Sequence, residues 1–226
     1  MEIAVYGHWG FALLMFPTAA ADYLEYERFQ LIDSIGGAID GGKCKAFSIN
    51  SINRESWLND HMHPRDKAIR HQQYNQYIVE EVIPFINEQC GGNVMVITTG
   101  ASLGALHAAN TFFRLPHIVH GTIAMSGSYD LKQYTKGYHD DNVYFNSPVD
   151  YLPHLEDHET LENMRRGRIH IVTGQGDFES PDESRRLSAV LHAKSIDHEL
   201  DLWGYDMPHD WPTWRQMLPH YLDTRF

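Results

Sequence analysis

Short apolar runs alternate along this chain with longer amphipathic segments. Runs such as 93–98 lie between glycines, which is typical of a buried parallel strand. Segment 68–89 instead places Tyr74, Ile78 and Val82 on one face of a 3.6-residue period, which indicates a helix. The pattern predicts strands at 3–6, 11–16, 45–50, 93–98, 121–126, 168–173 and 198–203, and helices at 68–89, 103–113, 181–195 and 211–222.

Alternating strands and helices predict an α/β protein whose mostly parallel sheet is covered by helices on both faces. We expect one domain over residues 1–226, with a hairpin-like turn at 7–10 and a helix kink at Pro84. Residues 129–166 interrupt the alternation with many tyrosines and two prolines. They predict an excursion from the sheet that acts as a cap.

Composition narrows the classes of partner. A formal net charge of -12 disfavours nucleic acids and anionic membrane surfaces, which leaves neutral small molecules or other protein subunits as partners. The longest apolar run, residues 11–17, is too short to cross a bilayer, and the first residues do not resemble a secretion signal. Two cysteines, Cys44 and Cys90, are no disulfide framework, so we expect reduced thiols and a cytoplasmic protein.

A nucleophile motif follows the strand at 93–98. Residues 100–104 read Gly-Ala-Ser-Leu-Gly, a G-x-S-x-G pattern between a buried strand and a helix. Such a sharp strand-to-helix turn exposes the serine hydroxyl, and the glycines avoid collisions with neighbouring backbone. The helix N-terminus adds N–H groups for a developing oxyanion. The motif predicts an α/β-hydrolase fold with Ser102 as nucleophile.

A serine nucleophile needs a histidine base and a carboxylate that orients it, and in this fold they follow in the order Ser, Asp or Glu, His. His209 lies between the last strand and the last helix, at the edge where Ser102 is expected. Asp177 follows the strand at 168–173 through a glycine-rich turn and is the favoured acid. Glu179 and Asp130 remain alternatives.

The oxyanion needs two backbone donors. One is expected at Leu103, directly after the nucleophile, and the other in the small-residue loop after strand 11–16, at Ala19 or Ala20. Trp57 follows a strand on the same edge and is a candidate for lining the substrate pocket, although core packing explains it equally well.

These motifs resemble the putative-esterase family of α/β hydrolases, which includes esterase D, feruloyl and acetyl xylan esterases and mycolyltransferases. The resemblance is carried by the Ser102 motif, by Gly-Gln-Gly before Asp177, and by the run His-Asp-Trp-Pro-Thr-Trp that begins at His209. It extends from Val5 to the last helix, and it implies Ser102, Asp177 and His209 as the triad. The family's usual His-Gly at the end of the oxyanion strand is replaced here by Phe16-Pro17-Thr18.

The sequence therefore predicts a serine carboxylester hydrolase that acts on small or short-chain acyl esters through an acyl-enzyme, with no cofactor or metal. An acyltransferase with the same triad is an alternative, and a non-catalytic binding or scaffold protein is another. An intact set of serine, acid and histidine argues against the scaffold. Homo-oligomerisation is compatible with the sequence, but no segment specifies an interface.

Overall fold

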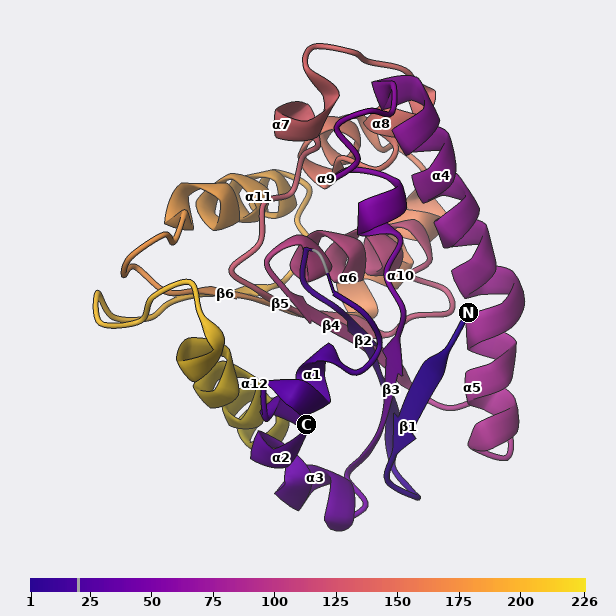
Figure 1. Cartoon of the computed structure of the whole chain (residues 1–226), viewed down its shortest axis with the longest axis vertical. Coiled ribbons are helices and arrows are strands. Elements are labelled where there is room, and N and C mark those ends of the chain that lie inside the picture. Colours follow the sequence, from indigo (N-terminus) through magenta and orange to yellow (C-terminus); the bar gives the residue numbers. More distant parts are fainter. Residues whose placement is uncertain (20) are drawn as a thin grey trace.

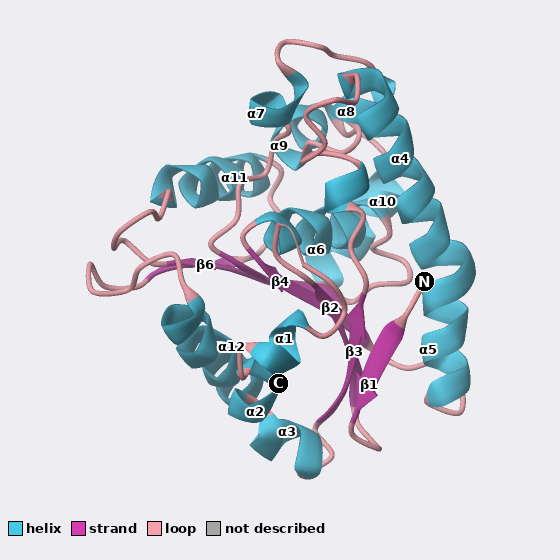
Figure 2. Cartoon of the chain, in the orientation of Figure 1, coloured by secondary structure: helices cyan, strands magenta, loops and turns pink. Residues whose placement is uncertain are grey.

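The computed structural model describes residues 1–19 and 21–226, and a single sheet organises this part of the chain. Its seven strands lie in the order β1-β3-β2-β4-β5-β6-β7. Only β1 is antiparallel to its neighbour, which confirms the mostly parallel sheet (Figure 2). The strands are β1 (Ile3–Tyr6), β2 (Phe11–Phe16), β3 (Cys44–Ile49), β4 (Val96–Ala101), β5 (Gly121–Met125), β6 (Arg168–Thr173) and β7 (Glu199–Leu202).

The expected hairpin between β1 and β2 is wrong, because β3 lies between these strands. Ala46 of β3 is paired with Tyr6 on one side and with Leu13 on the other. A Cβ atom at Gly10 would lie 2.2 Å from the carbonyl oxygen of Lys43, just before β3. The turn at 7–10 therefore passes close over the start of β3, and the half-buried β1 forms the edge of the sheet.

Helices cover both faces of the sheet, as the alternating pattern predicts (Figure 1). The strands carry apolar side chains on both sides: Leu14 of β2 joins the core on one face, and Leu13 joins the core on the other. The first face carries α4 (Pro64–Tyr77), α5 (Ile83–Gln89), α6 (Leu103–Arg114), α10 (His158–Arg166) and α11 (Pro181–Ala193). The second carries α1 (Glu25–Arg28), α2 (Leu31–Ser34), α3 (Gly36–Asp40) and α12 (Trp211–Arg225).

The helix expected at 68–89 is longer and is interrupted near Pro84. It begins at Pro64, widens into a π-helical segment at Ile78–Val82, and continues as α5. Proline lacks an N–H and crowds the carbonyl of the preceding turn, and a wider turn relieves this crowding.

Among the described residues, no helix has the length and apolar character required to cross a membrane.

The excursion at 129–166 leaves the sheet after β5 and returns at β6. It contains the short helices α7 (Lys132–Thr135), α8 (Asp141–Tyr144) and α9 (Pro148–Tyr151), followed by η3 (Leu152–His154, a 3-10 turn) and α10. Helix α8 packs on α4, and α9 packs on α6 and α11. Figure 1 shows α7, α8 and α9 together above α6 and next to the upper part of α4, and the chain enters this excursion directly after β5.

Candidate active site

Ser102 lies on a strained turn between β4 and α6. Its φ and ψ angles are 58° and -124°, which a residue with a side chain rarely adopts. Its N–H donates to the carbonyl of Met125 at the end of β5, over 2.9 Å, and its own carbonyl accepts from Ala105 over 3.0 Å. The neighbouring strand and the first turn of α6 thus hold this conformation in place.

The two glycines of the motif are required by close backbone contacts. A Cβ atom at Gly100 would lie 2.3 Å from the carbonyl oxygen of Gly104. A Cβ atom at Gly104 would lie 2.3 Å from the oxygen of Phe16 and 2.6 Å from that of Pro17. The start of α6 therefore packs directly on the loop that follows β2, which any larger residue at Gly104 would displace.

His209 approaches Ser102 from the loop between β7 and α12. Its Nε2 atom lies 3.0 Å from the Ser102 hydroxyl oxygen. Its backbone N–H donates to the carbonyl of Asp177 over 2.9 Å, and its ring lies at 85° to that of Trp214, with 5.1 Å between the ring centres. The structure thus places the predicted base within hydrogen-bond distance of the predicted nucleophile.

The carboxylate at His209 belongs to Glu179, and this corrects the preference for Asp177. The Oε2 atom of Glu179 lies 3.2 Å from Nδ1 of His209, and the Glu179 side chain is 1% exposed. Asp177 is exposed and contributes its backbone carbonyl. The third alternative, Asp130, lines the cavity beside Ser102 but is paired with the guanidinium of Arg186 at 2.6 Å.

The course of the chain after β6 explains why the later residue faces the histidine. Gly174 and Gly176 pack so closely on Met207 that a Cβ atom at Gly174 would lie 2.0 Å from its carbonyl oxygen. Phe178 then adopts a φ of 65°, and its ring is 92% exposed. This turn directs Asp177 and Phe178 outward and brings Glu179 back beneath the imidazole.

The Glu179 carboxylate accepts hydrogen bonds from several donors besides the histidine. Ser126 donates to Oε1 over 2.5 Å, the Gly174 N–H donates to Oε1 over 3.2 Å, and Thr173 donates to Oε2 over 3.0 Å. Burial raises the pKa of this carboxyl, but the bonds from His209, Ser126 and Thr173 outweigh burial and hold the pKa below its ordinary value. The group is therefore ionised at neutral pH.

The donors predicted for the oxyanion lie near the nucleophile as far as the structure describes them. Leu103 is the first residue of α6, where backbone N–H groups lack acceptors within the helix. Ala19 packs on the apolar cluster that includes Leu103 and Leu106. Ala20 lies outside the described residues.

A cavity of about 490 Å³ opens beside Ser102 and His209. Leu103, Leu106 and Tyr134 provide apolar surface, and Phe178 lies on its rim. The rest of the lining is polar or small: Ser126, Gly127, Ser128, Asp130, Lys132, Gln133, Ser180 and Glu183. The excursion thus forms one wall of the cavity.

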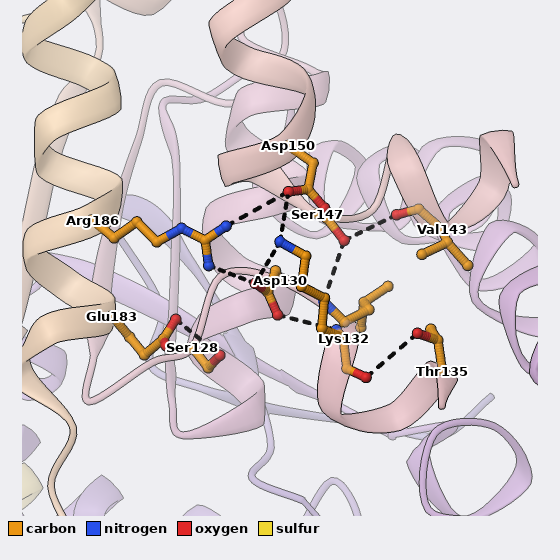
Figure 3. A network of polar contacts seen from close by, with 10 residues as sticks. Ser128, Asp130, Lys132, Thr135, Val143, Ser147, Asp150, Glu183 and Arg186 are labelled. Atoms are coloured by element: carbon orange, nitrogen blue, oxygen red, sulfur yellow. Dashed lines mark hydrogen bonds and ion pairs between the residues drawn. The ribbon is translucent and has the colours of Figure 1, made fainter. Parts of the chain in front are cut away.

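Charged groups fix this wall in place (Figure 3). Asp130 is paired with Arg186 of α11 at 2.6 Å and with Lys132 at 3.5 Å. Asp150 of α9 joins the same group, 3.2 Å from Lys132 and 3.7 Å from Arg186. The network ties the excursion to α11, and no sequence pattern indicates it because Asp150 and Arg186 are far from Asp130 in the chain.

Trp57, the residue predicted to line the pocket, is 1% exposed and is not among the described lining residues. Its indole N–H donates to Nδ1 of His71 over 3.0 Å, and its ring lies 6.2 Å from that of Tyr134. Trp57 thus supports the wall from behind, which corrects the substrate-contact alternative and agrees with core packing.

Comparisons with known proteins agree with this geometry. A family model described as putative esterase matches residues 48–224. No curated protein matches the chain by sequence. Among solved structures, a ferulic acid esterase is 18% identical with a TM-score of 0.73, and the match covers 95% of this chain and 84% of that one.

Two S-formylglutathione hydrolases also resemble the chain. The enzyme from Staphylococcus aureus is 14% identical with a TM-score of 0.64, over 97% of this chain and 82% of its own. The enzyme from Agrobacterium tumefaciens is 12% identical with a TM-score of 0.67, over 99% and 86%. At these identities the likeness shows a shared α/β-hydrolase fold.

Proposed function

Because the chain belongs to the putative-esterase family and is a serine esterase, we propose that it hydrolyses carboxylic esters through an acyl-enzyme on Ser102. His209 is the general base and Glu179 is the acid of the triad. The observation that carries this assignment is the continuous path from Ser102 Oγ to His209 Nε2 and from His209 Nδ1 to the Glu179 carboxylate, with separations of 3.0 and 3.2 Å.

The reaction follows from this path. The Ser102 oxygen attacks the ester carbonyl carbon while its proton passes to Nε2 of His209. The imidazolium that forms is stabilised by the ionised Glu179, and the carbonyl oxygen, now negative, accepts from the Leu103 N–H and from the loop after β2. The tetrahedral intermediate expels the alcohol, which takes the proton from Nε2. Water then attacks the acyl group in the same way and releases the acid.

The cavity supports a small acyl group and a polar alcohol. Its apolar surface is limited to Leu103, Leu106, Tyr134 and the rim residue Phe178, which gives no long groove for a fatty chain. The serines, Gln133 and Glu183 offer hydrogen bonds to hydroxyl or amide groups. In a series of p-nitrophenyl esters we expect kcat/KM to be highest for short acyl chains. A preference for chains beyond about eight carbons would contradict this, because each added CH₂ gains about 0.8 kcal/mol only where apolar surface receives it.

Replacement of the nucleophile tests the catalytic assignment directly. Ser102→Ala should abolish turnover of p-nitrophenyl acetate and prevent labelling by a fluorophosphonate probe, because no other group supplies the attacking oxygen. Ser128→Ala is a matched control, since Ser128 lines the same cavity but contacts Glu183. The control variant should retain labelling. Full activity of Ser102→Ala would refute the proposal.

A further inference from the structure

We propose that Asn53 and Glu25 are positioning residues that fix the peptide between Thr18 and Ala19, so that the Ala19 N–H is the second oxyanion donor. The proposal rests on the proposed function and names the donor that the sequence left open between Ala19 and Ala20. It follows from how each polar group of Thr18 is held.

The Glu25 carboxylate accepts the hydrogen bond of the Thr18 N–H. This carboxylate, from the start of α1, is 6% exposed as a residue. It accepts from the Thr18 N–H at 2.8 Å through Oε2 and from the Thr18 hydroxyl at 2.6 Å through Oε1. The Thr18 amide is therefore engaged within the protein and is unavailable to a substrate oxyanion.

Asn53 holds the carbonyl at the other end of the same residue. Its Nδ2 atom donates to the Thr18 oxygen over 3.3 Å. The Thr18–Ala19 peptide is trans, and in a planar trans peptide the carbonyl and the next N–H point in opposite directions. The Ala19 N–H therefore points away from Asn53.

We infer that side from the sheet order. Asn53 lies in the segment after β3, and Ser102 directly follows β4, while β2 is paired with both strands and lies between them. A donor that leaves the loop after β2 on the side opposite Asn53 faces the side of Ser102. The contact of Gly104 with Phe16 and Pro17 keeps this loop against the first turn of α6, where Leu103 supplies the other donor.

His107 fixes the orientation of the Asn53 amide. Its Nε2 atom lies 2.9 Å from Oδ1 of Asn53. Because the Thr18 carbonyl can only accept, the Asn53 nitrogen must face it, so Oδ1 faces His107 and Nε2 carries the proton. Burial lowers the pKa of His107 to about 4, so the ring is neutral at pH 7 and this tautomer can persist. His107 belongs to α6, so the same helix that begins with Leu103 also steadies the second donor.

Three variants test the two positioning residues. Asn53→Asp keeps the shape and the acceptor for His107 but replaces the donor to Thr18 by an oxygen. Glu25→Ala removes both bonds to Thr18. Glu25→Gln is the conservative variant, because its carbonyl can accept from the N–H while its NH₂ donates to the Thr18 hydroxyl. Asn110→Asp is the matched control: Asn110 is equally buried in α6, and its Nδ2 donates to Asn146, remote from the oxyanion loop.

The readouts are kcat and KM for p-nitrophenyl acetate, inhibition by phenylboronic acid, and the unfolding midpoint. Phenylboronic acid forms a tetrahedral adduct on a serine and so samples the oxyanion site without turnover.

Complete loss of one oxyanion donor costs about 10²–10³-fold in kcat, so misdirecting it should cost about 10- to 100-fold. We expect this loss in Asn53→Asp and Glu25→Ala, with little change in KM and an equal loss of boronate affinity. Glu25→Gln should stay within about threefold of the parent, and Asn110→Asp should lose stability alone.

The outcomes separate this inference from the proposed function. If Ser102→Ala is inactive but Asn53→Asp and Glu25→Ala keep the parent kcat and boronate affinity, the positioning role is refuted and the esterase assignment stands. The role is also refuted if Asn110→Asp loses as much kcat as Asn53→Asp, since general loosening then explains both. If Asn53→Asp does not fold, Thr18→Val against Thr18→Ser decides, because only serine keeps the hydroxyl bond to Glu25.

Discussion

The assignment of Glu179 as the triad acid predicts a large effect of one atom. In Glu179→Gln the carboxylate is replaced by an amide of the same shape, whose NH₂ can occupy either oxygen position. At the Oε1 position it would face the N–H of Gly174, which is another donor. At the Oε2 position it faces Nδ1 of His209 and the Thr173 hydroxyl, both of which can accept. The second orientation is therefore preferred.

That orientation places His209 in the wrong tautomer. If Nδ1 accepts from the amide, the ring proton lies on Nε2, which can then no longer take the proton of Ser102. A comparable carboxylate-to-amide change in a serine protease triad lowers kcat by about 10⁴-fold. We expect a loss of about 10³–10⁴-fold in kcat for p-nitrophenyl acetate hydrolysis by Glu179→Gln. Asp177→Asn should stay within about twofold, because Asp177 is exposed and its contact with His209 uses the backbone carbonyl.

The same variant also has a pH signature in stability. The pKa of Glu179 is lower in the folded protein than its ordinary value, so its ionisation stabilises the fold above the unfolded pKa of about 4.3. That contribution is lost as the pH falls through the folded pKa. The difference in unfolding free energy between the parent and Glu179→Gln should therefore be constant at neutral pH and shrink in acid, measured by urea unfolding between about pH 7 and pH 3.

A kcat for Glu179→Gln above a tenth of the parent value, or an equal loss of kcat in Asp177→Asn, would refute Glu179 as the acid.

Two further predictions concern packing and specificity. Gly104→Ala should lower the unfolding free energy by about 1–3 kcal/mol in urea unfolding, because its Cβ would overlap the backbone oxygens of Phe16 and Pro17. Gly37→Ala is the control and should be neutral or stabilising, because a Cβ there meets nothing within 4 Å. Equal stability of Gly104→Ala and the parent would contradict the close contact. Phe178→Ala should leave the unfolding midpoint unchanged, because the ring is 92% exposed. Loss of the stacking of this ring on the substrate should lower kcat/KM for naphthyl acetate relative to ethyl acetate by about 2- to 12-fold. Equal losses for both esters would exclude such stacking.

The sequence alone predicted the fold and the nucleophile because both depend on local signals. Alternating apolar runs and amphipathic segments predict a parallel α/β sheet, and the G-x-S-x-G motif specifies a turn whose close contacts only glycine permits. His209 was also identified locally, since its place between the last strand and the last helix puts it on the edge of the sheet where Ser102 lies. The strand at 11–16 was predicted within its observed bounds for the same reason.

The tertiary structure decided the features that depend on contacts between distant segments. Whether Asp177 or Glu179 faces His209 depends on how the turn after β6 packs against Met207, which lies in a different loop. The pairing of β1 with β3 and the burial of Trp57 against His71 likewise depend on which segments become neighbours in space. The orientation of the Ala19 N–H depends on Glu25, Asn53 and His107, none of which carries a recognisable motif. Periodicity and motifs report what each segment requires locally, whereas the direction of a side chain or a peptide is set by the partners that folding brings to it.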